Sequence, residues 1–436
     1  MPGEHLQHEG TWIAWPHNNE YGPWYIEDVQ PTSVALTDAL QEGENVHIIV
    51  LDSDHENQAK DALSAAGVPL TNLYFHHYPT NDLWTRDNGP MFVFSEDDQL
   101  TILDWGFNGW GGDTEYDLDD DVPYEVYSNH SLPYIDLNDV VLEGGAIEQD
   151  GNGTLIATRS SVTHSSRNPG LSESEIEDTL EQYIGATNII WLDGVYGLEL
   201  TDQHIDGFVK FADETTIVTM DSTDLIAWDV LPTDISALYA AVNSVGDSYS
   251  FEYLPLTQNT VTTTYGDDLG YRGSYINYYI GNEVIVVPTY NDPNDAVAIS
   301  IIEGIHPDRT VIGVDVRDLY AYGGMIHCIT QQRPFDPNGV GMDEHSEMSS
   351  QLFQNAPNPA DENTTVSFNL TEAGAVSLKV IDARGRLLKI IEPENMEAGK
   401  QEILLELGGL ENGTYYYSLI LNDVYQSTRA FQIRRK

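Results

Sequence analysis

Five polar side chains, spread along the chain, could together perform covalent chemistry on a cationic substrate. They are Asp87, His204, Asp206, Asn277 and Cys328. Cys328 is the only cysteine among 436 residues, so it is either a small buried apolar side chain or a chemical group. A thiol acts as a nucleophile only when neighbouring groups activate it. The interpretation of Cys328 therefore depends on whether the other four side chains converge on it.

The set suits a substrate that is both cationic and electrophilic, and a guanidinium group meets both conditions. Its planar fork donates paired hydrogen bonds to carboxylates such as Asp87 and Asp206, and a thiolate can attack its central carbon. Two buried carboxylates are costly unless a cation neutralises them. Taken singly, each residue has a plainer interpretation, because Asp87 precedes the turn Asn88-Gly89-Pro90 and such aspartates commonly cap turns.

Two further choices follow from local spacing. In an extended segment, His204 and Asp206 would share one face, whereas His327 would point away from its neighbour Cys328. His204, and not His327, is therefore the predicted base. The chain lacks a second cluster of His or Cys at metal-ligand spacing, so we predict no metal and no cofactor.

A recurring unit is expected to position these residues. Each unit is a short β-branched run, a helix that ends at or near glycine, and a second β-branched run. The units comprise residues 46–77, 154–192, 216–254 and 283–314, and a partial fifth unit begins at residue 12. Such repetition predicts an array of α/β units around an axis, with equivalent loops opening at one end. Asp87, His204, Asp206, Asn277 and Cys328 all fall in such loops.

Charge excludes several classes of partner. The chain has 71 acidic and 18 basic residues, a formal net charge of -53, which repels nucleic acid and anionic membranes and attracts cations. It has no apolar run long enough to span a membrane, and no signal peptide at its beginning. Salt would screen the acidic surface, which favours a saline habitat.

Residues 351–436 carry nine bases and eleven acids, a net charge of -2, so the other -51 lies on residues 1–350. This contrast predicts two domains.

The first 335 residues resemble the agmatine deiminase family, which includes bacterial peptidylarginine deiminases. The motifs that carry the resemblance are MPGE (1–4), TWIAWP (11–16), DLWTRDNGP (82–90), FNGWGG (107–112), EGG (143–145), HID (204–206) and GMIHCITQQRP (324–334). The resemblance implies an α/β fold, the five-bladed α/β propeller (pentein) of guanidine-modifying enzymes. That fold agrees with the repeating units.

The resemblance also implies a covalent mechanism. Cys328 would be the nucleophile, His204 the general acid/base, and Asp87 and Asp206 the residues that hold the guanidinium nitrogens. The thiolate attacks the guanidinium carbon, His204 protonates the departing ammonia, and a thiouronium intermediate forms. His204 then activates water, which releases a ureido product.

Three more residues take supporting roles by the same resemblance. Trp84 would line the substrate pocket and Glu143 would orient His204. Asn277 is similar to the polar residue near the thiol in the peptidylarginine branch. Residues 105–113 contain no Arg or Lys that could bind a substrate carboxylate, which favours agmatine and the product N-carbamoylputrescine.

Other functions remain open at this point. Peptidyl or free arginine could replace agmatine as the substrate. Cys328, His204 and Asn277 could instead form the catalytic group of a cysteine protease, in which Asp87 and Asp206 would have no role. A non-catalytic surface-binding protein is the third alternative.

The C-terminal region is predicted to be separate. Residues 336–350 contain glycine, proline and serine without apolar periodicity and are expected to form a linker. Residues 351–436 contain six or seven short alternating runs, which predict a small β-sandwich. Residues 352–360 (LFQNAPNPA), the strand GTYYY (413–417) and the basic end RRK (434–436) resemble the sorting domain of the type IX secretion system. This resemblance implies that the machinery of that system is a partner and that the protein is secreted or held at the cell surface.

Overall fold

The computed structural model describes residues 1–18, 22–130, 132–336, 351–353, 355, 357–370, 373–382, 386–410, 412–421 and 424–435. It divides into two compact units. The first comprises Met1–Phe94, Thr101–Tyr127 and Pro133–Pro334; the second comprises Ser95–Leu100, Ser128–Leu132 and Phe335–Lys436. All of the predicted linker 336–350 except its first residue lies outside the described residues.

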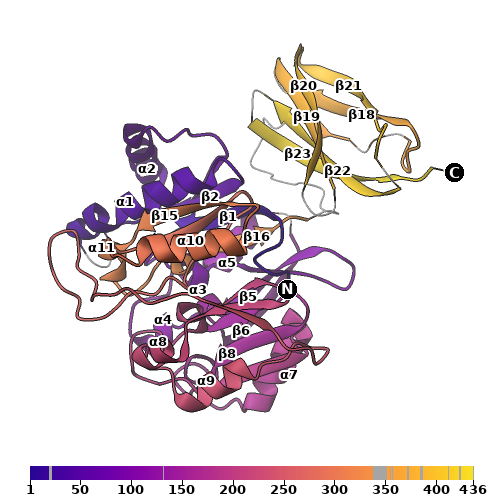
Figure 1. Cartoon of the computed structure of the whole chain (residues 1–436). Helices are drawn as coiled ribbons and strands as arrows, with labels where there is room; N and C mark the ends of the chain where they lie inside the picture. The colour runs from indigo at the N-terminus through magenta and orange to yellow at the C-terminus, as the bar shows by residue number, and fades with distance from the viewer. Residues whose placement is uncertain are drawn as a thin grey trace. The chain divides into compact units, whose positions relative to one another are not determined.

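The first unit is built from short strands and helices that alternate along the chain (Figure 1). Its strands are β1 His8–Ala14, β2 Asn45–Val50, β3 Leu73–His77, β4 Met91–Phe94, β5 Leu100–Gly106, β6 Tyr134–Val141, β7 Ile147–Gln149, β8 Thr154–Thr158, β9 Asn188–Leu192, β10 Val209–Asp213, β11 Thr216–Thr219, β12 Ser250–Tyr253, β13 Tyr279–Ile280, β14 Val284–Thr289, β15 Thr310–Asp315 and β16 Gln331–Pro334. Its helices are α1 Pro23–Leu40, α2 Ser53–Ala66, α3 Thr85–Asn88, α4 Gly109–Gly112, α5 Val122–Asn129, α6 Arg159–Val162, α7 Glu173–Ile184, α8 Ser222–Ala227, α9 Pro232–Tyr239, α10 Asp295–Ile305 and α11 Arg317–Tyr320. Three 3-10 turns are η1 Gly144–Ala146, η2 Ile205–Gly207 and η3 His327–Ile329.

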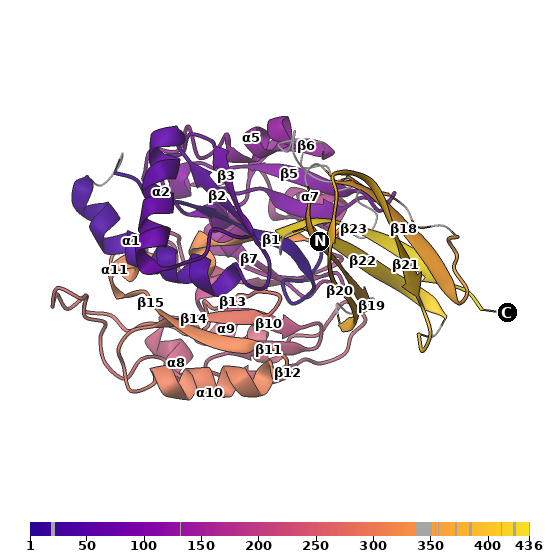
Figure 2. The same cartoon turned by 90° about the horizontal axis from the view of Figure 1, so that it is seen from above.

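Within the described residues, the strands of the first unit form five separate sheets. Their strand orders are β16-β1-β2-β3, β4-β5-β6, β7-β8-β9, β10-β11-β12 and β13-β14-β15. Each sheet contains a parallel pair whose connection includes a helix: β1 and β2, β5 and β6, β8 and β9, β11 and β12, and β14 and β15. Figure 2 shows α10 along the outer side of β14 and β15. The predicted units 46–77, 154–192, 216–254 and 283–314 are therefore present. The partial fifth unit predicted from residue 12 instead shares a sheet with unit 46–77, and the fifth sheet, β4-β5-β6, lies in residues 91–141, where no unit was predicted.

The first and last parts of this unit share a sheet. Strand β16, which follows the Cys328 segment, pairs antiparallel with β1, and Trp12 lies opposite Gln331. The strands of this sheet are largely buried, and Trp12 is 0% exposed. This pairing fixes the position of the segment that carries Cys328.

Helix ends follow the expected chemistry in two units and depart from it in a third. Gly67 and Gly185 end α2 and α7 with φ of 82°, a left-handed conformation that glycine adopts without steric cost. In unit 216–254 the sequence pattern predicts a helix over residues 233–245 that ends at Gly246, whereas α9 ends at Tyr239. The Asn243 side chain accepts hydrogen bonds from the backbone N–H groups of Val245 and Asp247, and this local turn competes with the helix.

The second unit contains two antiparallel sheets that share one hydrophobic core. Its strands are β17 Gln351–Leu352, β18 Asn363–Leu370, β19 Gly374–Asp382, β20 Leu387–Met396, β21 Gly399–Glu406, β22 Gly413–Leu421 and β23 Val424–Ile433. The sheet orders are β17-β18-β21 and β20-β19-β22-β23. In the core, the Tyr417 hydroxyl donates to the backbone oxygen of Phe353 at 2.8 Å. This bond ties the motif at residues 352–360 to β22.

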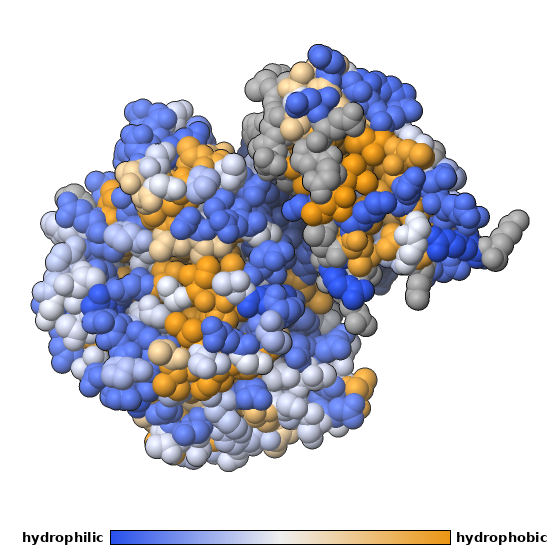
Figure 3. All heavy atoms as spheres, turned by 45° about the horizontal axis from the view of Figure 1, so that its top comes forward, coloured by the Kyte–Doolittle hydropathy of each residue, from blue (hydrophilic) through white to orange (hydrophobic). Residues whose placement is uncertain are grey.

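The face of the two units drawn in Figure 3 carries both hydrophilic and hydrophobic residues. Figure 3 shows hydrophilic residues spread over this face of each unit, with hydrophobic residues gathered in smaller patches between them. No helix in the described part of the chain is both long enough and apolar enough to cross a bilayer.

Candidate active site

Cys328 lies in the 3-10 turn η3, directly before β16. The argument that His327 points away from Cys328 assumed an extended segment, whereas this part of the predicted loop is a turn. The turn is held by Asn277, because its side-chain oxygen accepts a hydrogen bond from the His327 backbone N–H at 2.9 Å. The turn, and not the alternation of a strand, therefore decides where Cys328 and His327 point.

The Cys328 sulfur has two side-chain partners. Both polar atoms of the Asn277 amide lie near it, Nδ2 at 3.4 Å and Oδ1 at 3.5 Å, and Asp206 Oδ2 lies at 3.8 Å. Asn277 can thus donate to a thiolate or accept from a thiol. Burial raises the pKa of Cys328 well above its ordinary value, and the charges of Asp206 and Asp87 raise it further. These effects favour the thiol over the thiolate.

His204 faces two carboxylates. Its Nε2 lies 2.7 Å from Glu143 Oε2, and its Nδ1 lies 3.7 Å from Asp87 Oδ1. Burial by itself would lower the pKa of His204, but the Asp87 charge and the hydrogen bond to Glu143 outweigh it and raise that pKa to about 9. At neutral pH this histidine is an imidazolium and can act as an acid.

Asp87 is held by two donors from different segments. The backbone N–H of Gly145 donates to its Oδ1 at 2.9 Å, and the indole N–H of Trp110 donates to its Oδ2 at 2.9 Å. Burial raises the pKa of Asp87; His204 opposes this shift, and Glu143 and Asp206 add to it. A carboxylate crowded by others in this way favours a bound cation.

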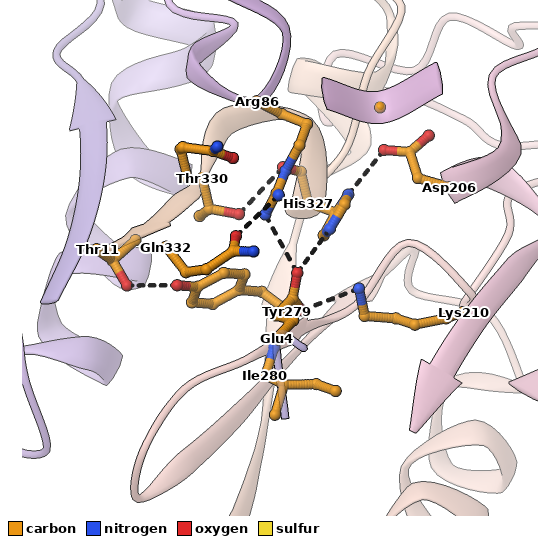
Figure 4. A network of polar contacts seen from close by, with 12 residues as sticks. Glu4, Thr11, Arg86, Asp206, Lys210, Tyr279, Ile280, His327, Thr330 and Gln332 are labelled. Atoms are coloured by element: carbon orange, nitrogen blue, oxygen red, sulfur yellow. Dashed lines mark hydrogen bonds and ion pairs between the residues drawn. The ribbon is translucent and has the colours of Figure 1, made fainter. Parts of the chain in front are cut away.

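Asp206 lies in η2, a 3-10 turn that begins at Ile205, so His204 and Asp206 do not alternate as they would in the extended segment considered from the sequence. Asp206 Oδ2 nevertheless lies close to the thiol, and it also contacts His327 Nδ1 at 2.8 Å (Figure 4). Burial would raise the pKa of Asp206, but the hydrogen bond and charge of His327 lower it. His327 is therefore a neighbour of Asp206, which the prediction of an outward-pointing side chain did not anticipate.

Trp84 is buried beside the site. Its indole N–H donates to Asp82 Oδ2 at 2.7 Å. A Cβ placed on Gly324, in the Cys328 segment, would lie 2.3 Å from the Trp84 ring. The indole therefore packs directly on the backbone that leads to the nucleophile.

Two residues of this site were not predicted. Arg167 has no exposed side-chain area, and its Nε donates to Glu143 Oε1 at 2.6 Å while Nη1 donates to Asp202 Oδ2 at 2.7 Å. Trp110 adopts a φ of 55°, and its neighbour Gly111 a φ of 98°. The sequence contained a signal for each residue. Arg167 is one of the few bases in residues 1–350. Trp110 lies in a glycine-rich run, which marks a backbone conformation that other residues adopt only under strain.

One small volume is surrounded by three of the predicted side chains. A Cβ placed on Gly145 would lie 2.6 Å from His204 Nδ1, 2.8 Å from Asp87 Oδ1 and 3.2 Å from Asp206 Oδ2. The structure thus brings together Asp87, His204 and Asp206, with Cys328 beside Asp206. Among the described residues, no group of three or more His, Cys, Asp or Glu is arranged to hold a metal ion.

Comparison with known proteins gives a family for each unit. Residues 1–334 match the Porphyromonas-type peptidyl-arginine deiminase family, and residues 356–434 match the secretion system C-terminal sorting domain. The agmatine deiminase of Pseudomonas aeruginosa is 31% identical over 356 residues, which cover 77% of this chain and 95% of that protein.

Solved structures agree with these matches. The agmatine deiminase of Enterococcus faecalis has a TM-score of 0.69 and 27% identity, covering 77% of this chain and 95% of its own. The agmatine deiminase of C. jejuni with substrate bound has a TM-score of 0.65 and 24% identity, covering 77% of this chain and 96% of its own. The latter similarity concerns the fold alone.

Proposed function

Because the chain belongs to the Porphyromonas-type peptidyl-arginine deiminase family, we propose that it hydrolyses agmatine to N-carbamoylputrescine and ammonia. The enzyme is a hydrolase that acts on the C–N bond of a guanidinium group. The observation that carries the proposal is the convergence around Gly145, where two carboxylates and an imidazole surround one point. A cationic, planar, electrophilic group matches that arrangement.

The proposed mechanism uses four side chains. Asp87 and Asp206 hold the guanidinium nitrogens, the Cys328 thiol loses its proton to solvent as the cation binds, and the resulting thiolate attacks the central carbon. Protonated His204 gives a proton to the departing nitrogen, ammonia leaves, and a thiouronium intermediate forms. Neutral His204 then takes a proton from water, whose oxygen adds to the same carbon. The thiolate leaves, the new hydroxyl loses its proton as the C=O of the ureido product forms, and this proton balances the one that the thiol lost at the start.

Protonation states support this order of events. His204 begins as the acid because its pKa is about 9. The thiol begins protonated because burial and the charges of Asp206 and Asp87 raise its pKa. A guanidinium cation bound between these carboxylates would cancel their effect and favour the thiolate. The substrate itself would therefore activate the nucleophile.

The charges around the site support a substrate without a carboxylate. Arg86, Arg167 and Lys210 are buried bases, and each pairs with carboxylates of this chain. Residues 105–113 contain no base. Agmatine needs no further cation, whereas arginine would bring a carboxylate that must be neutralised. Peptidylarginine is the second candidate, because the matching family carries that description.

The test is ammonia release from agmatine, free arginine and a peptide ending in arginine, at low and high salt. We expect release from agmatine, no release from Cys328→Ala, and a loss of at least about 100-fold in kcat/KM for Asp87→Asn. Release only from the peptide would assign the second candidate. Peptide cleavage that persists in Asp87→Asn would instead indicate a cysteine protease.

The same resemblance supports two further proposals. The five separate sheets would be the blades of a five-bladed α/β propeller, with the site at its axis, and the second unit would be a β-sandwich. Because residues 356–434 match a secretion sorting domain, this part of the chain would bind the type IX machinery and direct the enzyme to the cell surface or the medium.

A further inference from the structure

Glu4 and His327 form a buried chain of contacts that ends on Asp206. His327 Nδ1 lies 2.8 Å from Asp206 Oδ2, and His327 Nε2 lies 2.8 Å from Glu4 Oε2 (Figure 4). All three side chains are buried. A carboxylate can only accept, so the imidazole can donate to both carboxylates at once only if both ring nitrogens carry protons.

Glu4 holds one end of this Glu4–His327–Asp206 chain of contacts. Its Oε1 contacts Lys210 Nζ at 2.9 Å and accepts from the Ile280 backbone N–H at 3.0 Å, and its Oε2 contacts Arg86 Nη2 at 3.2 Å. These donors come from β10, β13 and α3, and His327 comes from η3. Their charges keep the pKa of Glu4 well below its ordinary value although burial would raise it. Glu4 thus joins segments up to 323 residues apart.

The Glu4–His327–Asp206 chain of contacts connects the segment that carries Asp206 with the segment that carries Cys328. Asp206 lies just before β10, which Lys210 ties to Glu4, and Cys328 follows His327 in η3. The Cys328 sulfur lies 3.8 Å from the same Asp206 oxygen that His327 contacts. Both contacts use Oδ2, which is also the Asp206 oxygen 3.2 Å from a Cβ placed on Gly145, so these contacts fix the oxygen that faces the proposed substrate position.

We propose that His327 and Glu4 are positioning residues for deimination: the Glu4–His327–Asp206 chain orients the Asp206 carboxylate against Cys328 and the substrate. This inference rests on the proposed function, in which Asp206 holds the guanidinium. Neither Glu4 nor His327 touches the reacting atoms. Their effect acts through Asp206, so it depends on the bond to Nδ1 and not on the presence of a polar side chain alone.

Two replacements of His327 distinguish a requirement for the bond between Nδ1 and Asp206 from a requirement for any polar side chain at this position. In His327→Asn, the amide nitrogen can stand where Nδ1 stood and donate to Asp206, but the contact with Glu4 is lost. In His327→Gln, the amide nitrogen stands near the Nε2 position, so the contact with Glu4 is kept and that with Asp206 is lost. We expect His327→Gln to lower kcat/KM for agmatine by about 10- to 100-fold, with both kcat and KM affected, and His327→Asn, which keeps the donor to Asp206 but loses the contact with Glu4, to lower it by a smaller factor of about 2- to 5-fold.

A second measurement needs no turnover. Cys328 is the only cysteine, so iodoacetamide alkylation reports on it alone. Without a donor at Nδ1, the Asp206 charge acts more fully on the thiol, and we expect alkylation of His327→Gln to be on the order of 3- to 10-fold slower than that of His327→Asn. His55 is the matched control, because it is a buried histidine of α2 that bonds the Pro16 carbonyl; His55→Asn should change neither measurement.

The outcomes distinguish this inference from the function on which it rests. A wild-type protein that releases no ammonia from any guanidinium substrate would refute the function, and the alkylation rates would still test the chain of contacts. Equal kcat/KM and equal alkylation rates in the two His327 variants, in an active enzyme, would overturn the inference.

If either His327 variant fails to fold, substitutions of Glu4 and Glu148 test the inference instead. Glu4→Gln should lower kcat/KM more than Glu148→Gln, because Glu148 shares Lys210 but lies 3.9 Å from His327 Nε2. Equal losses would overturn the inference.

Discussion

Replacing Glu143 by glutamine should lower the pKa of His204. The Glu143 carboxylate lies 2.7 Å from His204 Nε2, and both side chains are almost completely buried. In the wild-type protein the pKa of His204 is raised from 6.5 to about 9, roughly 3 kcal/mol of preference for the imidazolium. Glutamine keeps the shape but removes the charge, so we expect the pKa to fall by on the order of 1 to 3 units.

The sign of the effect on stability follows from linkage. A raised histidine pKa stabilises the folded protein fully below about pH 6.5, and this contribution is lost as the pH rises through about 9. Glu143→Gln should therefore lose stability relative to wild type at neutral pH, and the difference should narrow above pH 9. At neutral pH the variant should also contain less imidazolium to protonate the leaving ammonia.

The assay is an NMR titration of the histidine ring nitrogens, with His204 assigned from a His204→Asn sample. Asp202→Asn is the control, because Asp202 is the other carboxylate that pairs with Arg167. It perturbs the same arginine without touching the imidazole, and asparagine tolerates the φ of 60° at this position. A wild-type His204 that titrates near 6.5, or equal shifts in Glu143→Gln and Asp202→Asn, would refute this account of the electrostatics.

Two other predictions follow from the fold. Gly145→Ala should abolish deimination, because the new methyl group would lie within 3 Å of His204 Nδ1 and Asp87 Oδ1; steady-state kinetics check this, and substantial activity would contradict the proposed substrate position. Deleting residues 351–436 should keep the enzyme from leaving a host that has a type IX secretion system; immunoblots of cells and medium check this, and unchanged export would contradict the role of the sorting domain.

Much of the site could be predicted because its signals are local. The single cysteine, the His204-Ile205-Asp206 motif and each repeating unit can be recognised within one short segment. The structure brings Asp87, His204 and Asp206 together, and it places Cys328 beside Asp206 and Asn277. The strands and helices of the four predicted units could also be predicted from the sequence, because the alternation of residues in a strand and the glycine at a helix end depend on near neighbours.

The conformation of the two reactive segments could not be predicted in this way. The sequence argument placed these side chains by the alternation of an extended segment, whereas Asp206 and Cys328 both lie in 3-10 turns. The turn at Cys328 is held by Asn277, a residue 50 positions from His327, so propensity within the segment could not decide it. The direction of the His327 side chain changed with the turn.

The sequence by itself determined which chemistry the protein can perform, because that depends on residue types: one thiol, an imidazole and carboxylates within family motifs. Only the tertiary structure decided how these groups are held. Arg167 beside Glu143, and Glu4 beside His327, are contacts between distant segments. A buried ion pair leaves no periodic pattern in either segment, because the two charges meet only in the tertiary structure, where their mutual attraction offsets the cost of removing both from water.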